Sequence, residues 1–171
     1  IFFRTDILEK YDIDVSNIKT LDDIDALYTQ VAEKEPDMWM LAASGMTDLT
    51  PVDLVDSGMG VFALVDPANS TEVVNYMATD AVREWCEYNR DWFNNGWINP
   101  GAASDTEPVY TYIKSGQAFS FFSNSGHPLS ESDQENNCGG IDLTMVQLGD
   151  PIASPTSSCV YCYAISSASR A

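Results

Sequence analysis

Four short loops of this sequence are rich in hydroxyl, amide and backbone N–H groups, which are the groups that contact neutral polar ligands. They read SGMTD (44–48), GAASDTE (101–107), SNSGHP (123–128) and ASPTSSC (153–159). Groups of this kind suit a ligand such as a sugar, and they indicate binding rather than a catalytic step. Ordinary surface loops share this composition, so the pattern indicates a site without specifying its ligand.

The single histidine, His127, lies in the third of these loops and is the candidate general base. No G-x-S-x-G motif accompanies it, and no acidic residue is placed by a motif to orient its ring. The sequence also lacks G-x-G-x-x-G, G-x-x-x-x-G-K-[ST] and H-E-x-x-H. We therefore expect no cofactor, no metal and no enzyme activity, with His127 at the surface or in contact with a ligand. A glycan hydrolase with two unassigned carboxylates stays open as the alternative, since such acids can converge from distant positions.

The four cysteines are Cys86, Cys138, Cys159 and Cys162. The last two have the C-x-x-C spacing of redox and zinc half-sites. They fall in a β-rich run, where residues three apart point to opposite faces of a sheet, and no second pair completes four zinc ligands. We expect buried thiols. A disulfide involving Cys138, and metal or redox chemistry at Cys159 and Cys162 in an oxidoreductase, are the alternatives.

A strong negative charge restricts the partners of this chain. The 171 residues include 26 acidic and 8 basic side chains, for a formal net charge of -18. Such a surface repels nucleic acid phosphates and anionic membranes, so we expect no nucleic acid partner. The length and the 44% apolar content fit one globular domain that spans residues 1–171.

The two ends of the sequence suggest a piece of a longer protein. It begins IFFRTDILEK, without Met and already inside a patterned element, and it ends directly after a predicted strand. No export signal and no apolar run of about 18 residues is present, so the chain carries no predicted membrane span.

Predicted strands place three of the four loops at the ends of strands. Residues 118–122, AFSFF, form an apolar strand that we expect to be buried on both faces, and Gly116 before it suits the left-handed residue that ends a helix. Residues 37–43 and 141–148 are two further predicted strands, and residues 159–165 form the last. In open α/β sheets, ligands bind outside the carboxyl ends of such strands.

Two amphipathic helices are predicted to cover the sheet. Thr20 caps the first, which Pro36 ends, and Thr79 caps the second, which spans residues 80–95. The positions expected in the core are Ile24, Leu27, Tyr28 and Val31 of the first helix, and Val82, Trp85, Cys86, Asn89, Trp92 and Phe93 of the second.

Shorter elements complete the predicted organisation. Residues 107–114 form a helix with Pro108 in its first turn, and residues 129–137 form an exposed helix or loop. A surface hairpin away from the site pairs residues 61–65 with residues 73–76. Residues 52–55 fit a helical turn, residues 1–4 are a short apolar segment, and Trp39 is expected to pack in the core. Alternating strands and helices of this kind predict a three-layer α/β lobe.

Several motifs resemble the extracellular solute-binding proteins of bacterial ABC importers, family 1. The run RTDILEKYDID (4–14) with IKTLDDI (18–24) is similar to the first of the family's motifs. IKSGQAF (113–119) resembles the family's helix-to-strand junction, and YAISSAS (163–169) resembles one of its later strands. KEPD (34–37) and DWFNNGWI (91–98) resemble the lipoprotein-type branch associated with sugar importers. The motifs span the chain in the family's order.

The resemblance implies a fold and a role. The fold would be a three-layer lobe of the type II periplasmic-binding-protein fold, a mixed sheet flanked by helices. Residues 1–171 would be the second lobe of a two-lobe protein, inserted in the first lobe. That protein would close its two lobes on a solute, a carbohydrate, and deliver it to an ABC permease. The parent protein would be extracellular and lipid-anchored to the outer face of the cell membrane, and the chain would be a monomer.

The resemblance also implies which loops face the ligand. The family often places an aromatic residue after the AFSFF-like strand, against the sugar ring. Here that loop holds Ser125, Gly126 and His127, so we expect hydrogen bonds from Asn124 or His127 instead of stacking. The full set of expected ligand contacts is Ser44, Met46, Thr47, Asn124, Ser125, His127, Thr156 and Ser157.

Overall fold

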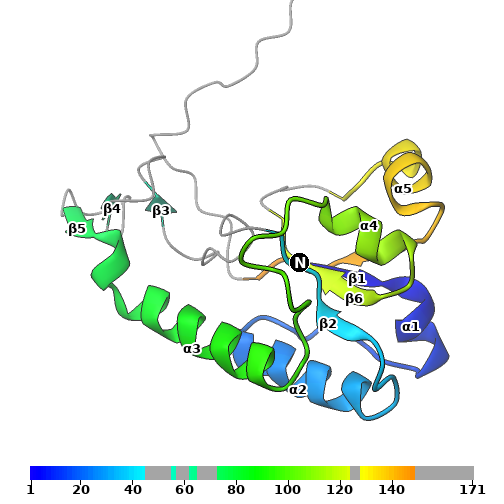
Figure 1. Ribbon diagram of the computed structural model, residues 1–171, viewed down its shortest axis with the longest axis horizontal. Helices are drawn as coiled ribbons and strands as arrows, with labels where there is room; N and C mark the ends of the chain where they lie inside the picture. The colour runs from blue at the N-terminus through cyan, green and yellow to red at the C-terminus, as the bar shows by residue number, and fades with distance from the viewer. Residues whose placement is uncertain (45–54, 57–61, 65–72, 124–127, 149–171) are drawn as a thin grey trace, which may run out of the picture. The chain divides into compact units, whose positions relative to one another are not determined.

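The structure is a computed structural model that describes residues 1–44, 55–56, 62–64, 73–123 and 128–148 (Figure 1). The chain divides into two compact units. Unit 1 consists of Ile1–Asp53 and Asp80–Asp150, and unit 2 consists of Leu54–Thr79 and Pro151–Ala171. Each unit is described by itself below.

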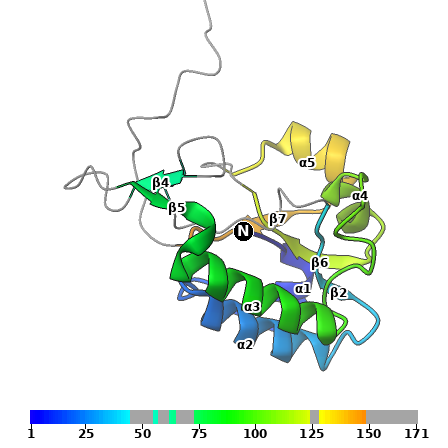
Figure 2. The same cartoon turned by 60° about the vertical axis from the view of Figure 1, so that its left-hand side comes forward.

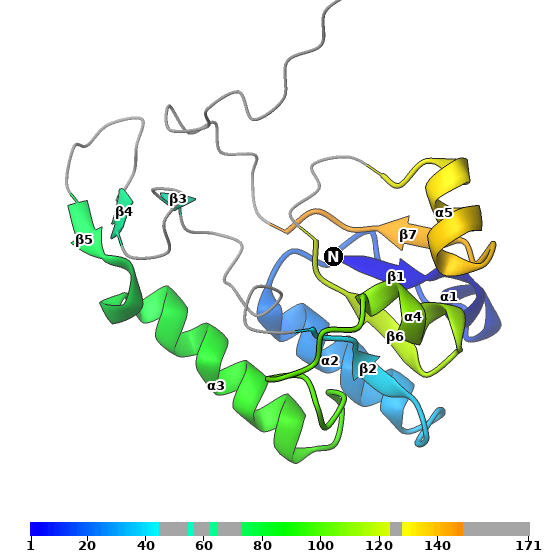
Figure 3. The same ribbon diagram turned by 45° about the horizontal axis from the view of Figure 1, so that its top comes forward.

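A mixed sheet forms the middle layer of unit 1. Its strands are β1 (Phe2–Arg4), β2 (Trp39–Leu41), β6 (Ala118–Phe121) and β7 (Leu143–Met145), in the spatial order β2-β6-β1-β7 (Figure 3). β2 runs parallel to β6, whereas β1 runs antiparallel to both β6 and β7. The predicted strands at 37–43, 118–122 and 141–148 are therefore confirmed, each with fewer residues than expected.

β1 is a strand that the sequence pattern does not predict, although it lies inside the sheet between β6 and β7. Three residues are too few for a periodic signal, and β1 is a strand because of the partners with which it pairs. Phe2 pairs with Phe121 of β6 and with Met145 of β7. The Phe2 and Phe121 rings stack with their centroids 5.2 Å apart.

Helices cover both faces of this sheet (Figure 2). The helices of the first face are α1 (Thr5–Lys10), α2 (Leu21–Ala32) and α3 (Asp80–Asn94), and those of the second face are α4 (Val109–Lys114) and α5 (Glu131–Cys138). On the first face Phe3 and Phe119 pack with Tyr28 and Trp92, and on the second face Phe2 and Phe121 pack with Ile113. Unit 1 therefore has the three layers and the mixed sheet flanked by helices that the sequence predicted.

The first predicted helix is confirmed as α2, together with its cap. The Thr20 hydroxyl accepts a hydrogen bond from the backbone N–H of Asp23 (3.2 Å), and the Asp23 carboxylate accepts one from the N–H of Thr20 (2.9 Å). This reciprocal pair satisfies backbone donors that a helix start would otherwise leave free. The four predicted core positions of α2, Ile24, Leu27, Tyr28 and Val31, are all buried.

The second predicted helix is confirmed as α3, but two of its expected core residues are on the surface. Trp85 and Trp92 are buried, with the Trp92 ring against Tyr28 at 5.0 Å between centroids. Cys86 is exposed and Phe93 is 50% exposed. Cys86 and Phe93 each follow a buried tryptophan by one position, so their side chains point about 100° away from it around the helix axis. The buried stripe of α3 is too narrow to include a tryptophan and the residue that follows it.

Glycines at positive φ mark the ends of the short helices. Gly116 ends α4 with φ of 76°, as predicted, and Gly139 ends α5 with φ of 68°. α4 begins one residue after Pro108, which is at the N-cap position, without a side-chain cap hydrogen bond, rather than inside the helix. The segment predicted as an exposed helix or loop is the helix α5, and Cys138 at its end is buried.

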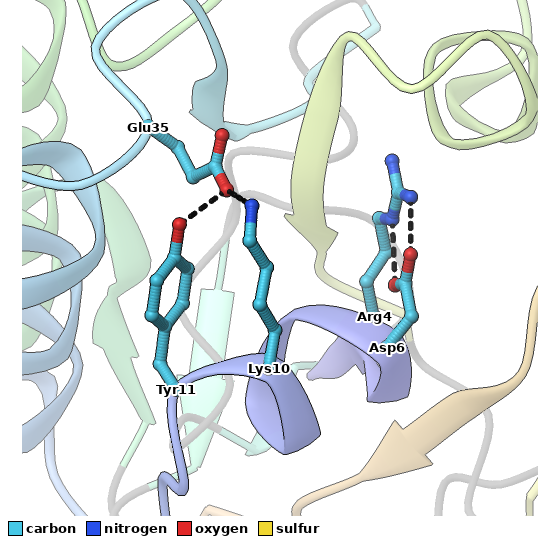
Figure 4. Close-up of polar contacts among 5 residues, drawn as sticks. All are labelled: Arg4, Asp6, Lys10, Tyr11 and Glu35. Carbon is cyan, nitrogen blue, oxygen red and sulfur yellow. Dashed lines mark hydrogen bonds and ion pairs between the residues drawn. The ribbon is translucent and has the colours of Figure 1, made fainter.

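Two clusters of polar contacts surround α1 (Figure 4). The Arg4 guanidinium donates to both carboxylate oxygens of Asp6, at 3.0 and 2.6 Å. Glu35, which follows α2, accepts hydrogen bonds from Lys10 (2.5 Å) and from the hydroxyl of Tyr11 (2.6 Å) on a single oxygen. These bonds attach the end of α1 to the segment between α2 and β2.

Unit 2 contains a three-stranded antiparallel sheet. Its strands are β3 (Val55–Asp56), β4 (Phe62–Leu64) and β5 (Val73–Asn75), and the short helix η2 (Tyr76–Ala78) follows. The predicted hairpin is confirmed as β4 and β5, while its turn (66–70) lies outside the described residues. The predicted helical turn at 52–55 is wrong at Val55, because Val55 pairs with Leu64 in the sheet. The predicted strand at 159–165 also lies outside the described residues.

Within the described part of the chain, no helix has the length and apolar character needed to cross a bilayer.

Candidate functional site

The candidate site lies at the edge of the unit 1 sheet where β2 and β6 end, which we call the candidate edge. Because β2 and β6 are parallel, with Leu41 opposite Ser120, both strands reach this edge with their carboxyl ends. β7 also ends here, since it and β6 are each antiparallel to β1. The loops predicted after residues 43 and 122 therefore leave the sheet at the same edge, where ligands of open α/β sheets collect.

Of the eight ligand contacts expected from the sequence, the structure describes Ser44, which is half-buried at the end of β2. The other seven, Met46, Thr47, Asn124, Ser125, His127, Thr156 and Ser157, lie outside the described residues. Their roles stay predictions.

Asn99 fixes the end of β2. The segment before it runs beside β2, because the N–H of Leu41 donates to the carbonyl of Trp97 (3.0 Å) and Leu41 forms a parallel bridge with Ile98. The Asn99 side chain continues this pairing, accepting from the N–H of Ala43 and donating to its carbonyl, both at 2.9 Å. Asn99 is 2% exposed, so its amide replaces a backbone partner in a place that water does not reach.

Asp105 connects Asn99 to the start of α4. One oxygen of its carboxylate accepts from the backbone N–H of Glu107 (2.9 Å), and the other accepts from the Asn99 amide (3.2 Å) and from the Tyr112 hydroxyl. These hydrogen bonds, first that of Tyr112 and then that of Glu107, lower the pKa of the Asp105 carboxyl. The same contact with Asp105 raises the pKa of Tyr112 to about 12. Near neutral pH the carboxylate is therefore charged and the phenol keeps its proton.

Ser44 is tied to the same group. Its hydroxyl donates to the backbone carbonyl of Asp105, at 3.3 Å. With its proton engaged, the Ser44 oxygen has lone pairs that can accept a hydrogen bond from a ligand hydroxyl or amide. Among the residues that the structure describes, Ser44 therefore offers the candidate edge an acceptor oxygen that is held in place by a hydrogen bond to Asp105.

Trp39 is partly buried and packs against the core, where the sequence predicted a core position. Its ring meets Tyr112 edge to face, with centroids 5.4 Å apart, beside the cluster that contains Phe2 and Ile113. The Trp39 ring is thus in contact with an aromatic residue of α4.

The expectation of buried thiols holds for Cys138 and is wrong for Cys86. Both are free cysteines, and Cys86 is exposed on α3. Cys159 and Cys162 lie outside the described residues. Among the residues that the structure describes, no group of three or more His, Cys, Asp or Glu side chains could hold a metal ion.

Asn99, Asp105 and Tyr112 were missed as site residues. The polar loop 101–107 was the signal available in the sequence. What the sequence could not show is that Ala43 and Asn99, 56 positions apart, are hydrogen-bonded. A side chain that pairs with a distant backbone leaves no local pattern.

Known structures share this fold. No family model matches the chain, and no curated protein matches it by sequence. The N-glycan transport solute-binding protein NgtS of Streptococcus pneumoniae, in complex with Man5GlcNAc, matches over 90% of this chain with 20% identity and a TM-score of 0.65. Its complex with Man1GlcNAc matches over 83% of this chain with 18% identity and a TM-score of 0.64.

This chain spans about a third of the length of the structures that it matches, 34% and 32% respectively. Sequence identities of 18% and 20% to these structures show a shared fold and nothing further. The likeness agrees with the order of layers in unit 1, in which a mixed sheet lies between helices on both faces. The chain therefore has the fold of a lobe of a periplasmic binding protein.

Proposed function

We propose that residues 1–171 are the second, inserted lobe of a two-lobe solute-binding protein that delivers a carbohydrate to an ABC importer. The observation that carries this proposal is the shared fold with a glycan-binding solute-binding protein, over about a third of that protein's length. The remaining two thirds of such a protein would supply the other lobe. Membership of family 1, lipid anchoring outside the cell and a monomeric state belong to the same proposal.

The candidate edge supports a neutral polar ligand. Ser44 offers an oxygen acceptor there, and the Asn99 and Asp105 side chains form the frame behind it. In the proposal, Ser44, Met46, Thr47, Asn124, Ser125, His127, Thr156 and Ser157 contact the sugar from this lobe. A net charge of -18 supports the absence of a nucleic acid partner.

Ligand binding would close the two lobes on the sugar. Each lobe then contributes part of the ligand contacts, and the closure is a hinge motion of two domains around a ligand. Residues 1–171 alone are therefore expected to bind the ligand much more weakly than the protein with both lobes. Equal affinity of residues 1–171 and of the protein with both lobes would contradict the proposal that each lobe supplies part of the binding site.

The test is calorimetry on the protein with both lobes, against Man1GlcNAc, Man5GlcNAc, other oligosaccharides, peptides and polyamines. We expect binding of oligosaccharides without turnover. Ser44→Ala and His127→Ala should each weaken binding roughly threefold to tenfold, the loss expected for one hydrogen bond. Ser16→Ala, in the exposed loop before α2, is the matched control and should bind like the wild type.

Two results would overturn the proposal. Tight binding of peptides or polyamines without sugars would remove the carbohydrate assignment. Release of shortened sugars during incubation, abolished by replacing one acidic residue, would establish the alternative, a glycan hydrolase with two carboxylates.

A further inference from the structure

Asp105 connects residues of the stretch 99–112 with one another and with Ser44, which lies 61 positions earlier in the sequence. Its carboxylate accepts from Asn99, which holds the end of β2, from the backbone of Glu107, and from Tyr112 on α4. Its backbone carbonyl accepts from Ser44. Every described polar contact of the Ser44 side chain and of the Asn99 side chain therefore goes to Ala43 or to Asp105.

Asp105 reinforces the orientation of the Asn99 amide that the backbone of Ala43 already selects. The Asn99 nitrogen donates to two acceptors, the Ala43 carbonyl and the Asp105 carboxylate, while its oxygen accepts from the Ala43 N–H. A rotated amide would place its oxygen against both acceptors. The charged carboxylate therefore favours the one orientation that pairs both backbone groups of Ala43.

The carboxylate itself has little capacity left for a ligand. It already accepts three hydrogen bonds, and a carboxylate offers about four acceptor positions. An effect of Asp105 on ligand binding must therefore pass mainly through Asn99, Ala43 and Ser44.

We propose that Asp105 is a positioning residue for ligand binding, which holds Ala43 and Ser44 in place at the candidate edge through Asn99 and its own backbone. This inference rests on the proposed function of the chain. A site held in its binding geometry before the ligand arrives loses less conformational entropy on binding. Tyr112 supports the arrangement by donating to the carboxylate from α4.

Asp105→Asn is the sharpest variant, because asparagine has one acceptor oxygen where the carboxylate has two. Its NH2 group would face either the N–H of Glu107 or the donors of Asn99 and Tyr112. Asp133→Asn is the matched control, since Asp133 also accepts from a hydroxyl, that of Ser130 (2.6 Å), but at the start of α5. Tyr112→Phe removes one donor to Asp105 and retains the ring, so it tests the same network if Asp105→Asn fails to fold.

Two measurements on the protein with both lobes test the inference. Calorimetry with Man5GlcNAc should show roughly tenfold weaker binding for Asp105→Asn, a smaller loss for Tyr112→Phe, and no change for Asp133→Asn. Hydrogen exchange should become faster at the Ala43 amide, which depends on Asn99, in Asp105→Asn. The neighbouring Ala42 amide, which donates to Ser120 in the sheet (2.8 Å), should keep its protection.

The two measurements separate this inference from the proposed function. Wild-type affinity in Asp105→Asn, or unchanged exchange at Ala43, would overturn the positioning role. Equal acceleration at Ala42 and Ala43 would also overturn it, because that pattern reports general destabilisation. If the wild type binds none of the oligosaccharides, the proposed function fails, and the exchange at Ala43 alone then decides whether Asp105 holds this end of β2.

Discussion

The Asn99 side chain forms two hydrogen bonds with the backbone of Ala43, both 2.9 Å long, across 56 positions of sequence. Together with the bridge between Leu41 and Ile98, they make the segment before Asn99 a lateral neighbour of β2. The segment lies along the outer side of β2, the edge strand of the sheet, and accepts a hydrogen bond from the N–H of Leu41 there. It also places Asp105 beside Ser44, which follows β2.

Asn99→Ala is expected to destabilise the fold by about 2 kcal/mol, because it leaves both backbone groups of Ala43 without a partner in a buried place. Urea denaturation measures the loss. Asn136→Ala is the control, since the Asn136 side chain bonds to Ser132 on the exposed surface of α5. A loss of equal size in both variants would contradict the role of Asn99.

Phe119→Ala should cost about 3–5 kcal/mol, since Phe119 is completely buried between Phe3 and Tyr28. Phe93→Ala removes the same ring from a site that is 50% exposed on α3 and should change stability by less than about 0.5 kcal/mol. Paired urea titrations compare the two variants. A large loss in Phe93→Ala would show that the outer surface of α3 is covered in the folded protein.

Glu35 should make stability depend on pH under acidic conditions. The hydrogen bonds from Lys10 and then Tyr11 lower the pKa of the Glu35 carboxyl in the folded state. The unfolded chain therefore takes up the proton first as the pH falls, so the contribution of Glu35 is present above its unfolded pKa of about 4.3 and is lost below it.

The measurement compares the wild type with Glu35→Gln over a range of pH. The difference in their free energies of unfolding should be constant from about pH 6 to 8 and should shrink below about pH 4.3. It should also be smaller than the loss in Asn99→Ala, because the Lys10 side chain is 55% exposed and water screens the pair. A difference that grows as the pH falls would contradict the arrangement in Figure 4.

Cys86 and Cys138 should differ in their reactivity. Cys86 is exposed, whereas Cys138 is completely buried and its burial, with the nearby Asp133, raises the pKa of its thiol. A maleimide reagent added to the folded protein should label Cys86 within minutes and Cys138 after unfolding, as read by peptide mass spectrometry. Cys86→Ser is the control and should remove the fast label from the peptide that contains residue 86. Fast labelling of Cys138 in the folded protein would contradict the packing of α5.

Local sequence patterns are sufficient for the elements that carry a repeated signal. The cap at Thr20, the apolar spacing from Ile24 to Val31 and the left-handed Gly116 each depend on residues within one turn or two, and the structure confirms all three. β1 depends instead on strands that lie more than a hundred positions away, and its three residues carry no period of their own.

The features of the candidate site also fall into those that the sequence predicts and those that only tertiary contacts decide. Residue types and spacing predict polar loops after buried strands, a surface too acidic for nucleic acid, and a three-layer lobe, because each of these follows from composition or local periodicity. The parallel pairing of β2 with β6 and the meeting of Ala43, Asn99 and Asp105 are decided by tertiary contacts. The reason is physical: a buried amide such as Asn99 gains its partners when distant segments pack and exclude water, and nothing in its neighbouring residues specifies them.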